Sequence, residues 1–137
     1  GDVDPKEILR GTHTILVIDW PSKDVPESLA GAGFEVIVRG GPGPTDYSVY
    51  ERNGAEIAVR PLGRAPERAD LVYCYRPLAE LPAIIEMARQ LGAKAIWPEF
   101  AQTGGGEMES ARRAVESAGL QFAGGSYIGE VAREIGR

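Results

Sequence analysis

Short apolar runs recur along the chain and are separated by longer segments whose apolar positions have helical spacing. The run Thr14–Ile18 is continuous and rich in β-branched residues. This pattern is typical of a strand buried on both faces, as in a parallel sheet covered by helices. Further short runs predict more strands over residues 34–38, 71–75, 94–97 and 120–123.

Helices are predicted before, between and after these strands. Asp4 is a suitable N-cap for a helix over Pro5–Arg10, whose first residue is proline. Another helix contains Pro82 near its start and ends at Gly92. Ser126 is the expected N-cap of the last helix. This last helix covers residues 126–135, and the two other predicted helices cover residues 26–30 and 107–118.

Residues 47–60 contain strand-forming residues on both sides of Asn53-Gly54, a dipeptide that favours a β-hairpin turn. Elsewhere strands and helices alternate, which is the pattern of an α/β fold. We therefore expect residues 1–137 to form a single domain with three layers and a doubly wound, mostly parallel sheet. In such sheets, ligands bind at the carboxyl ends of the strands, where the strand order reverses.

The loops that follow the predicted strands place several polar residues at this carboxyl edge. Three cations, Lys23, Arg39 and Arg76, are among them. They indicate a pocket for a phosphorylated or carboxylated ligand, although cations also end strands simply because they are solvated. The glycine-rich segment 103–106 precedes a helix and is either an anion-binding turn or a surface loop.

Composition narrows the possible functions. The 137 residues carry 15 basic and 20 acidic side chains, a net charge of −5, so the basic surface of a nucleic-acid-binding protein is not expected. The longest aliphatic run is too short to cross a membrane, and the N-terminus does not resemble a signal peptide. The single cysteine excludes an internal disulfide and a cysteine-based zinc site. These features fit a cytoplasmic protein.

Few side chains indicate catalysis. His13 precedes the first strand and therefore belongs to the amino edge, away from the expected crevice. Cys74 lies within a strand and is expected to be a small core residue. Asp19 and Glu99 follow strands at the carboxyl edge and could form an acid/base pair, but nothing in the sequence shows that they meet. No metal-ligating cluster is expected.

Two segments carry fairly specific local patterns. Residues 70–85 contain an aromatic–arginine strand end followed by a proline-initiated helix, and residues 91–97 contain a helix end that leads into a strand with a tryptophan. Residues 5–18 add a short helix before the first strand, and residues 118–130 add a closing strand and helix. In these four segments the chain resembles the small stand-alone CoA-binding proteins, which share a Rossmann-like domain with the N-terminal part of the succinyl-CoA synthetase α chain. The similarity extends from about Asp4 to the end of the chain.

The resemblance implies a binding domain for CoA or acyl-CoA without catalytic residues of its own. By position, the loops that follow the strands would supply the contacts. The implied residues are Asp19, Trp20, Pro21, Ser22 and Lys23, then Val38, Arg39 and Gly40, then Tyr75 and Arg76, and finally Glu99 and Phe100.

The first of these loops departs from the family pattern. Asp19-Trp20-Pro21 occupies positions where the family carries a glycine and a serine that approach the pyrophosphate. A carboxylate close to a pyrophosphate costs several kcal/mol unless a cation such as Lys23 offsets it. Further along, Arg39-Gly40-Gly41-Pro42 replaces Asn-Pro, Pro98-Glu99 replaces a glutamine-type residue, and Gly125-Ser126 stands where the family has a cysteine.

Three functional hypotheses remain. The leading one is non-catalytic binding of CoA or acyl-CoA, with the three edge cations neutralising phosphates and Tyr75 or Phe100 contacting the adenine or pantetheine. The second is a family member that no longer binds CoA and acts as a protein-interaction or regulatory module, with Trp20 and Pro21 filling the crevice. The third is an enzyme that uses Asp19 and Glu99. A homodimer or another protein partner is compatible with all three.

Overall fold

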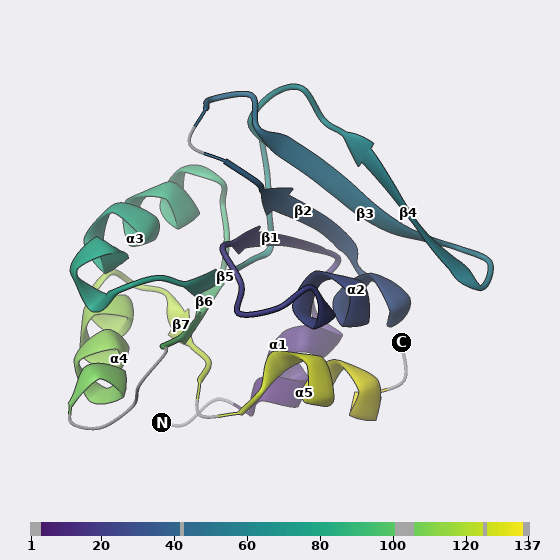
Figure 1. Cartoon of the computed structure of the whole chain (residues 1–137). Helices are drawn as coiled ribbons and strands as arrows, with labels where there is room; N and C mark the ends of the chain where they lie inside the picture. The colour runs from purple at the N-terminus through teal and green to yellow at the C-terminus, as the bar shows by residue number, and fades with distance from the viewer. Residues whose placement is uncertain (1–3, 42, 101–105, 125, 136–137) are drawn as a thin grey trace.

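The computed structural model describes residues 4–41, 43–100, 106–124 and 126–135. It contains one seven-stranded sheet with helices on both faces (Figure 1). The strands are β1 (Thr14–Ile18), β2 (Glu35–Arg39), β3 (Tyr47–Asn53), β4 (Glu56–Pro61), β5 (Leu71–Tyr75), β6 (Ala95–Glu99) and β7 (Gln121–Phe122). The helices are α1 (Pro5–Arg10), α2 (Asp24–Gly31), a 3-10 turn η1 (Leu78–Glu80), α3 (Leu81–Gln90), α4 (Glu107–Ser117) and α5 (Ile128–Ile135).

The sheet order is β4-β3-β2-β1-β5-β6-β7. β2, β1, β5, β6 and β7 are parallel, whereas β3 and β4 are antiparallel to their neighbours. The expected α/β class with a mostly parallel sheet is therefore confirmed. The chain moves from β1 outward to β2 and later returns to the other side of β1 as β5. The strand order thus reverses between β1 and β5.

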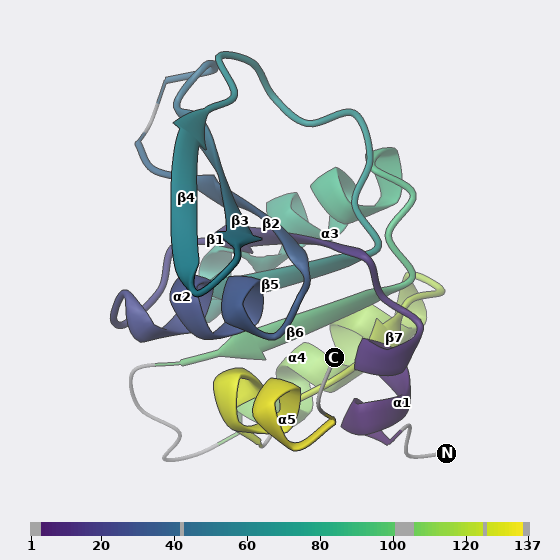
Figure 2. The same ribbon diagram turned by 90° about the vertical axis from the view of Figure 1, so that its right-hand side faces the viewer.

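Two apolar cores lie on opposite faces of the sheet. One face packs against α1, α2 and α5, and the other against α3 and α4 (Figure 2). Alternate residues of each central strand point to opposite cores: Val17 faces the first and Leu16 the second. Trp97 is fully buried in the first core, and its Nε1–H donates to the Ser126 carbonyl at 3.2 Å. This bond fixes the loop before α5 to the centre of the sheet.

Several predicted boundaries differ from the structure. The hairpin is present, but Asn53 pairs with Glu56, so the turn residues are Gly54 and Ala55. Gly54 has φ 67°, a conformation that glycine adopts without steric cost. The last helix begins after Tyr127, whose carbonyl accepts from the N–H groups of Glu130 and Val131, so Ser126 is not its N-cap. Asp4 does cap α1, because its Oδ1 accepts from Lys6 N at 2.9 Å.

Candidate functional site

A pocket of about 470 Å³ opens where the strand order reverses. It is formed by residues that follow β1, β2 and β5, the three strands whose carboxyl ends meet at this edge. The lining residues are Asp19, Trp20, Arg39, Gly40, Gly41 and Arg76. Five of them were candidate site residues in the sequence, and Gly41 was not.

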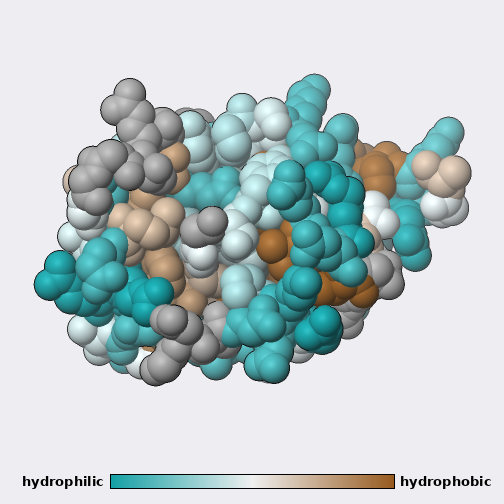
Figure 3. Space-filling model, turned by 90° about the horizontal axis from the view of Figure 1, so that it is seen from below, coloured by the Kyte–Doolittle hydropathy of each residue, from teal (hydrophilic) through white to brown (hydrophobic). Residues whose placement is uncertain are grey.

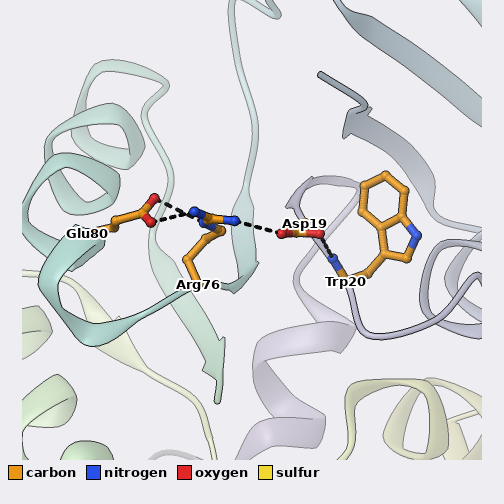
Figure 4. Close-up of polar contacts among 4 residues, drawn as sticks. All are labelled: Asp19, Trp20, Arg76 and Glu80. Atoms are coloured by element: carbon orange, nitrogen blue, oxygen red, sulfur yellow. Dashed lines mark hydrogen bonds and ion pairs between the residues drawn. The ribbon is translucent and has the colours of Figure 1, made fainter. Parts of the chain in front are cut away.

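Arg76 is held between two carboxylates (Figure 4). Its Nε and Nη2 donate to Glu80 Oε1 and Oε2 at 3.0 and 2.5 Å, and its Nη1 donates to Asp19 Oδ2 at 2.9 Å. The hydrogen bonds from Arg76 lower the pKa of Glu80, and the two carboxylates raise the pKa of Arg76. The three groups together carry one negative charge. Arg76 is therefore largely neutralised before any ligand arrives.

The backbone at the end of β1 aims the Asp19 carboxylate into this arrangement. Asp19 has φ 59°, and among the described residues it is the one non-glycine with positive φ. Aspartate tolerates this conformation better than most residues. Its Oδ1 accepts from Trp20 N at 2.9 Å, while Oδ2 accepts from Arg76. The two contacts tie the loop after β1 to the loop after β5.

Trp20 forms another part of the wall. Its indole lies on the side of Asp19 opposite Arg76 (Figure 4). The side chain is half-buried against the core that α1, α2 and α5 cover. It lines the pocket and does not fill it. An aromatic face in the wall of a pocket can contact a ligand ring.

Arg39 is the second cation of the pocket. It ends β2, where it pairs with Ile18 on one side and Tyr47 on the other. Within the described ranges, its guanidinium makes no hydrogen bond or ion pair. Its charge contributes to the low pKa of Glu80, which places it in the same electrostatic environment as Arg76. Arg39 thus has its N–H groups available for an incoming anion.

Seven predicted contact residues do not line the pocket. The Val38 side chain is buried in the core. Tyr75 and Phe100 are half-buried against opposite cores. The loop residues Pro21, Ser22 and Lys23 are exposed and lead into α2.

Glu99, the seventh, contacts a neighbouring strand and the start of α5. Its Oε1 accepts from Tyr73 Oη at 2.8 Å, and its Oε2 accepts from Ile128 N at 3.4 Å, at the start of α5. Burial raises the pKa of this carboxyl despite both hydrogen bonds. Asp19 and Glu99 are therefore engaged by separate partners, and of the two only Asp19 lines the pocket. This arrangement does not support an acid/base pair.

Other candidates from the sequence can also be placed. His13 lies before β1 at the amino edge, where its backbone N–H donates to Asp70 Oδ2. Cys74 is buried in β5, and burial raises the pKa of its thiol to about 12, so it remains protonated. Residues 103–105 of the glycine-rich segment lie outside the described residues. Among the described residues, no group of three or more metal-ligating side chains is present.

Sequence reasoning missed Glu80, which holds Arg76 from η1. The signal was present, because Arg76 and Glu80 have the i, i+4 spacing that brings side chains together in a helical turn.

None of the helices in the described ranges is long and apolar enough to span a bilayer.

No protein-family model matches the chain, and no curated protein matches it in sequence. Solved structures similar to it in fold include two that cover nearly the whole chain. Prb, the PH1109 protein redesigned for binding, is 19% identical with a TM-score of 0.66, over 97% of this chain and 91% of that one. Cell-free ID.343 from Thermus thermophilus is 19% identical with a TM-score of 0.64, over 97% of this chain and 99% of that one. At this identity the likeness establishes a shared α/β fold and nothing more.

Proposed function

We propose that the protein is a Rossmann-like module that binds CoA or acyl-CoA, without catalysis, at the pocket between the ends of β1, β2 and β5. One observation carries the proposal. Arg39, a cation with no hydrogen-bond or ion-pair partner among the described residues, lines a pocket of about 470 Å³ where the strand order reverses. Ligand sites of α/β sheets occur at this place, and the volume suits part of a nucleotide ligand.

The pocket residues divide the work of binding. Arg39 would neutralise a phosphate, whereas the Gly40 N–H already donates to the Asp46 carbonyl at 2.8 Å and is not available to it. The Asp46 carboxylate also lies close to Gly41. Trp20 would contact the adenine ring or the pantetheine arm. Arg76 uses three of its five N–H groups on Glu80 and Asp19, which leaves two for a ligand. We therefore assign Arg39 the larger share of the phosphate interaction. A single buried thiol suits a reducing compartment such as the cytoplasm.

Thermal melting with CoA, acetyl-CoA, NAD and ATP tests the proposal. A ligand at 100 times its dissociation constant adds about 2.7 kcal/mol of stability, which raises Tm by several degrees for a domain of this size. We expect the increase with CoA or acetyl-CoA. Arg39→Ala should abolish it. Arg89→Ala, which removes an exposed arginine of α3 outside the pocket lining, should retain it.

A second function is favoured by the state of Arg76. Two carboxylates already satisfy its charge, and such a site repels phosphate more than a free arginine would. The module would then bind a protein partner in place of a nucleotide. An unchanged Tm with every ligand tested, supported by the absence of heat in titration calorimetry, would favour this alternative. A shift with NAD or ATP alone would keep the pocket and replace the ligand.

A further inference from the structure

β4 forms an open edge of the sheet. Within the described part of the chain it pairs only with β3, and no helix or strand lies beyond it (Figure 2). The β3–β4 hairpin also projects from the body of the molecule at the right of Figure 3. Proteins usually protect such edges with like charges, prolines or bulges, because the free backbone groups can pair with another strand.

The backbone of β4 presents alternate residues to this open edge. Leu62 N donates to Tyr47 O, and in an antiparallel ladder hydrogen-bonded pairs alternate with unbonded pairs. The even-numbered residues of β4 therefore bond to β3. The N–H and C=O groups of Ile57 and Val59 point the other way, toward solvent. Val59 is also 54% exposed, the one large hydrophobic side chain so exposed among the described residues.

We propose that β4 is a homodimer interface, where two copies pair antiparallel about a two-fold axis through Ala58. In this register Glu56 lies opposite Arg60 of the second copy, and Ile57 lies opposite Val59 of the second copy. Each of these pairs occurs twice by symmetry. Opposite charges and β-branched pairs directly across a ladder stabilise it. The outward groups of Ile57 and Val59 form four backbone hydrogen bonds, and the two sheets become continuous.

The sequence favours this register over its neighbours. A shift of two residues in one direction places Ile57 opposite Pro61, which has no N–H to donate. A shift of two residues in the other direction places Arg60 opposite Gly54 and leaves Glu56 opposite Ala58. Both shifts lose the two opposite-charge pairs. A shift of one residue would put side chains of opposite faces against each other. Charge complementarity thus selects a second copy of this chain as the partner.

Cysteine cross-linking tests the register directly. In an unbonded antiparallel pair the two Cα atoms are about 4.5 Å apart, which a disulfide can span. Ala58→Cys should therefore give a disulfide-linked dimer on mild oxidation. Glu56→Cys, on the same exposed strand, should not, because its copy is offset by about 13 Å along the strand. The native Cys74 is buried and does not interfere. Equal cross-linking of both variants, or none, would overturn the register.

Charge reversal tests the same contact without a covalent bond. The variants are made in a Glu51→Gln background, because Glu51 pairs with Arg60 within one chain at 2.9 Å. Arg60→Glu or Glu56→Arg alone should weaken dimerisation by about tenfold in analytical ultracentrifugation. The double reversal should restore it, because each charge again faces its opposite. Equal melting temperatures of the single variants would show that they fold.

A third variant tests the backbone hydrogen bonds of the proposed interface. Val59→Pro removes an N–H that faces solvent and leaves the ladder to β3 intact, whereas Val59→Thr keeps that N–H. We expect a monomer for the proline variant and a dimer for the threonine variant. A native chain that stays monomeric at every concentration would refute the proposal. So would a double reversal that fails to restore association. None of these measurements uses a ligand, so the inference stands or falls separately from the proposed function.

Discussion

At the scale of single residues, Asp19 determines how strongly the pocket attracts an anion. Its carboxylate lines the cavity and also holds Arg76. Asp19→Asn tolerates the same positive φ, removes one negative charge and frees part of the Arg76 guanidinium. We expect CoA to bind roughly three- to tenfold more tightly to this variant in titration calorimetry. Glu86→Gln, which neutralises an exposed carboxylate on α3, is the control and should change nothing. Weaker binding by Asp19→Asn would mean that the carboxylate organises the site.

Glu99 gives a pH-dependent prediction at the same scale. Burial raises its pKa above the ordinary value of 4.5, so ionisation of this group costs more in the folded chain than in the unfolded one. This loss of stability is absent below pH 4.5 and grows as the pH rises through the pKa of Glu99 in the folded chain. Glu99→Gln carries no charge. The free energy of unfolding of Glu99→Gln, relative to that of the native chain, should therefore increase as the pH rises from about 4 to 7.

Urea denaturation at several pH values measures this difference. Glu116→Gln, on the exposed side of α4, provides a matched control without burial. A relative stability of Glu99→Gln that does not change with pH would contradict the assigned role of burial. The position at the start of α5 also predicts that Glu99→Gln weakens the contact to Ile128 N, because an amide oxygen is a poorer acceptor than a carboxylate.

At the scale of elements, Asp70 links the start of β5 to the start of β1. Its Oδ2 accepts from both His13 N and Thr14 N at 2.9 Å. Partial burial opposes ionisation, but these hydrogen bonds outweigh it and hold the pKa below 3.8. The resulting stability is present above 3.8 and is lost as the pH falls through the folded pKa.

Asp70→Asn should therefore destabilise the chain by about 1 kcal/mol at neutral pH, and the difference should disappear in acid. Chemical denaturation at pH 7 and near pH 3 checks both parts. A penalty that persists unchanged in acid would show that Asp70 acts through packing and not through its charge.

The elements themselves could largely be predicted from the sequence, because their signals are local. Residues 15–18 of β1 and 71–74 of β5 are buried and carry no charged side chain, as a strand between two helical layers requires. The errors fall where tertiary contacts decide. The hairpin turn moved by one residue because the pairing of β3 with β4, and not the dipeptide, fixes its register. The last helix starts at Ile128, whose N–H donates to Glu99, and Trp97 donates to the carbonyl of Ser126 before it.

The candidate site could be predicted only in position. Strand ends indicated which loops meet, and the residues of three of those loops do line one pocket. The partners of each side chain could not be predicted, because they depend on contacts distant in sequence. Arg76 reaches back to Asp19 across 57 positions, and Glu99 turns toward Tyr73 and α5. The sequence also gave no indication that Asp19 adopts a positive φ.

At the scale of the whole molecule, the pocket and the β4 edge are separate features that can be uncoupled. The pocket is lined by residues after β1, β2 and β5, whereas β4 lies at the far edge of the sheet, beyond β3. Arg39→Ala should lose the Tm increase with CoA and still dimerise. Val59→Pro should remain monomeric and retain the Tm increase, with an affinity within about twofold of the native chain. Melting and ultracentrifugation of the native chain and the two variants, each with and without CoA, measure both properties. Loss of ligand binding in the monomeric variant, at an unchanged melting temperature without ligand, would instead show that dimerisation completes the site.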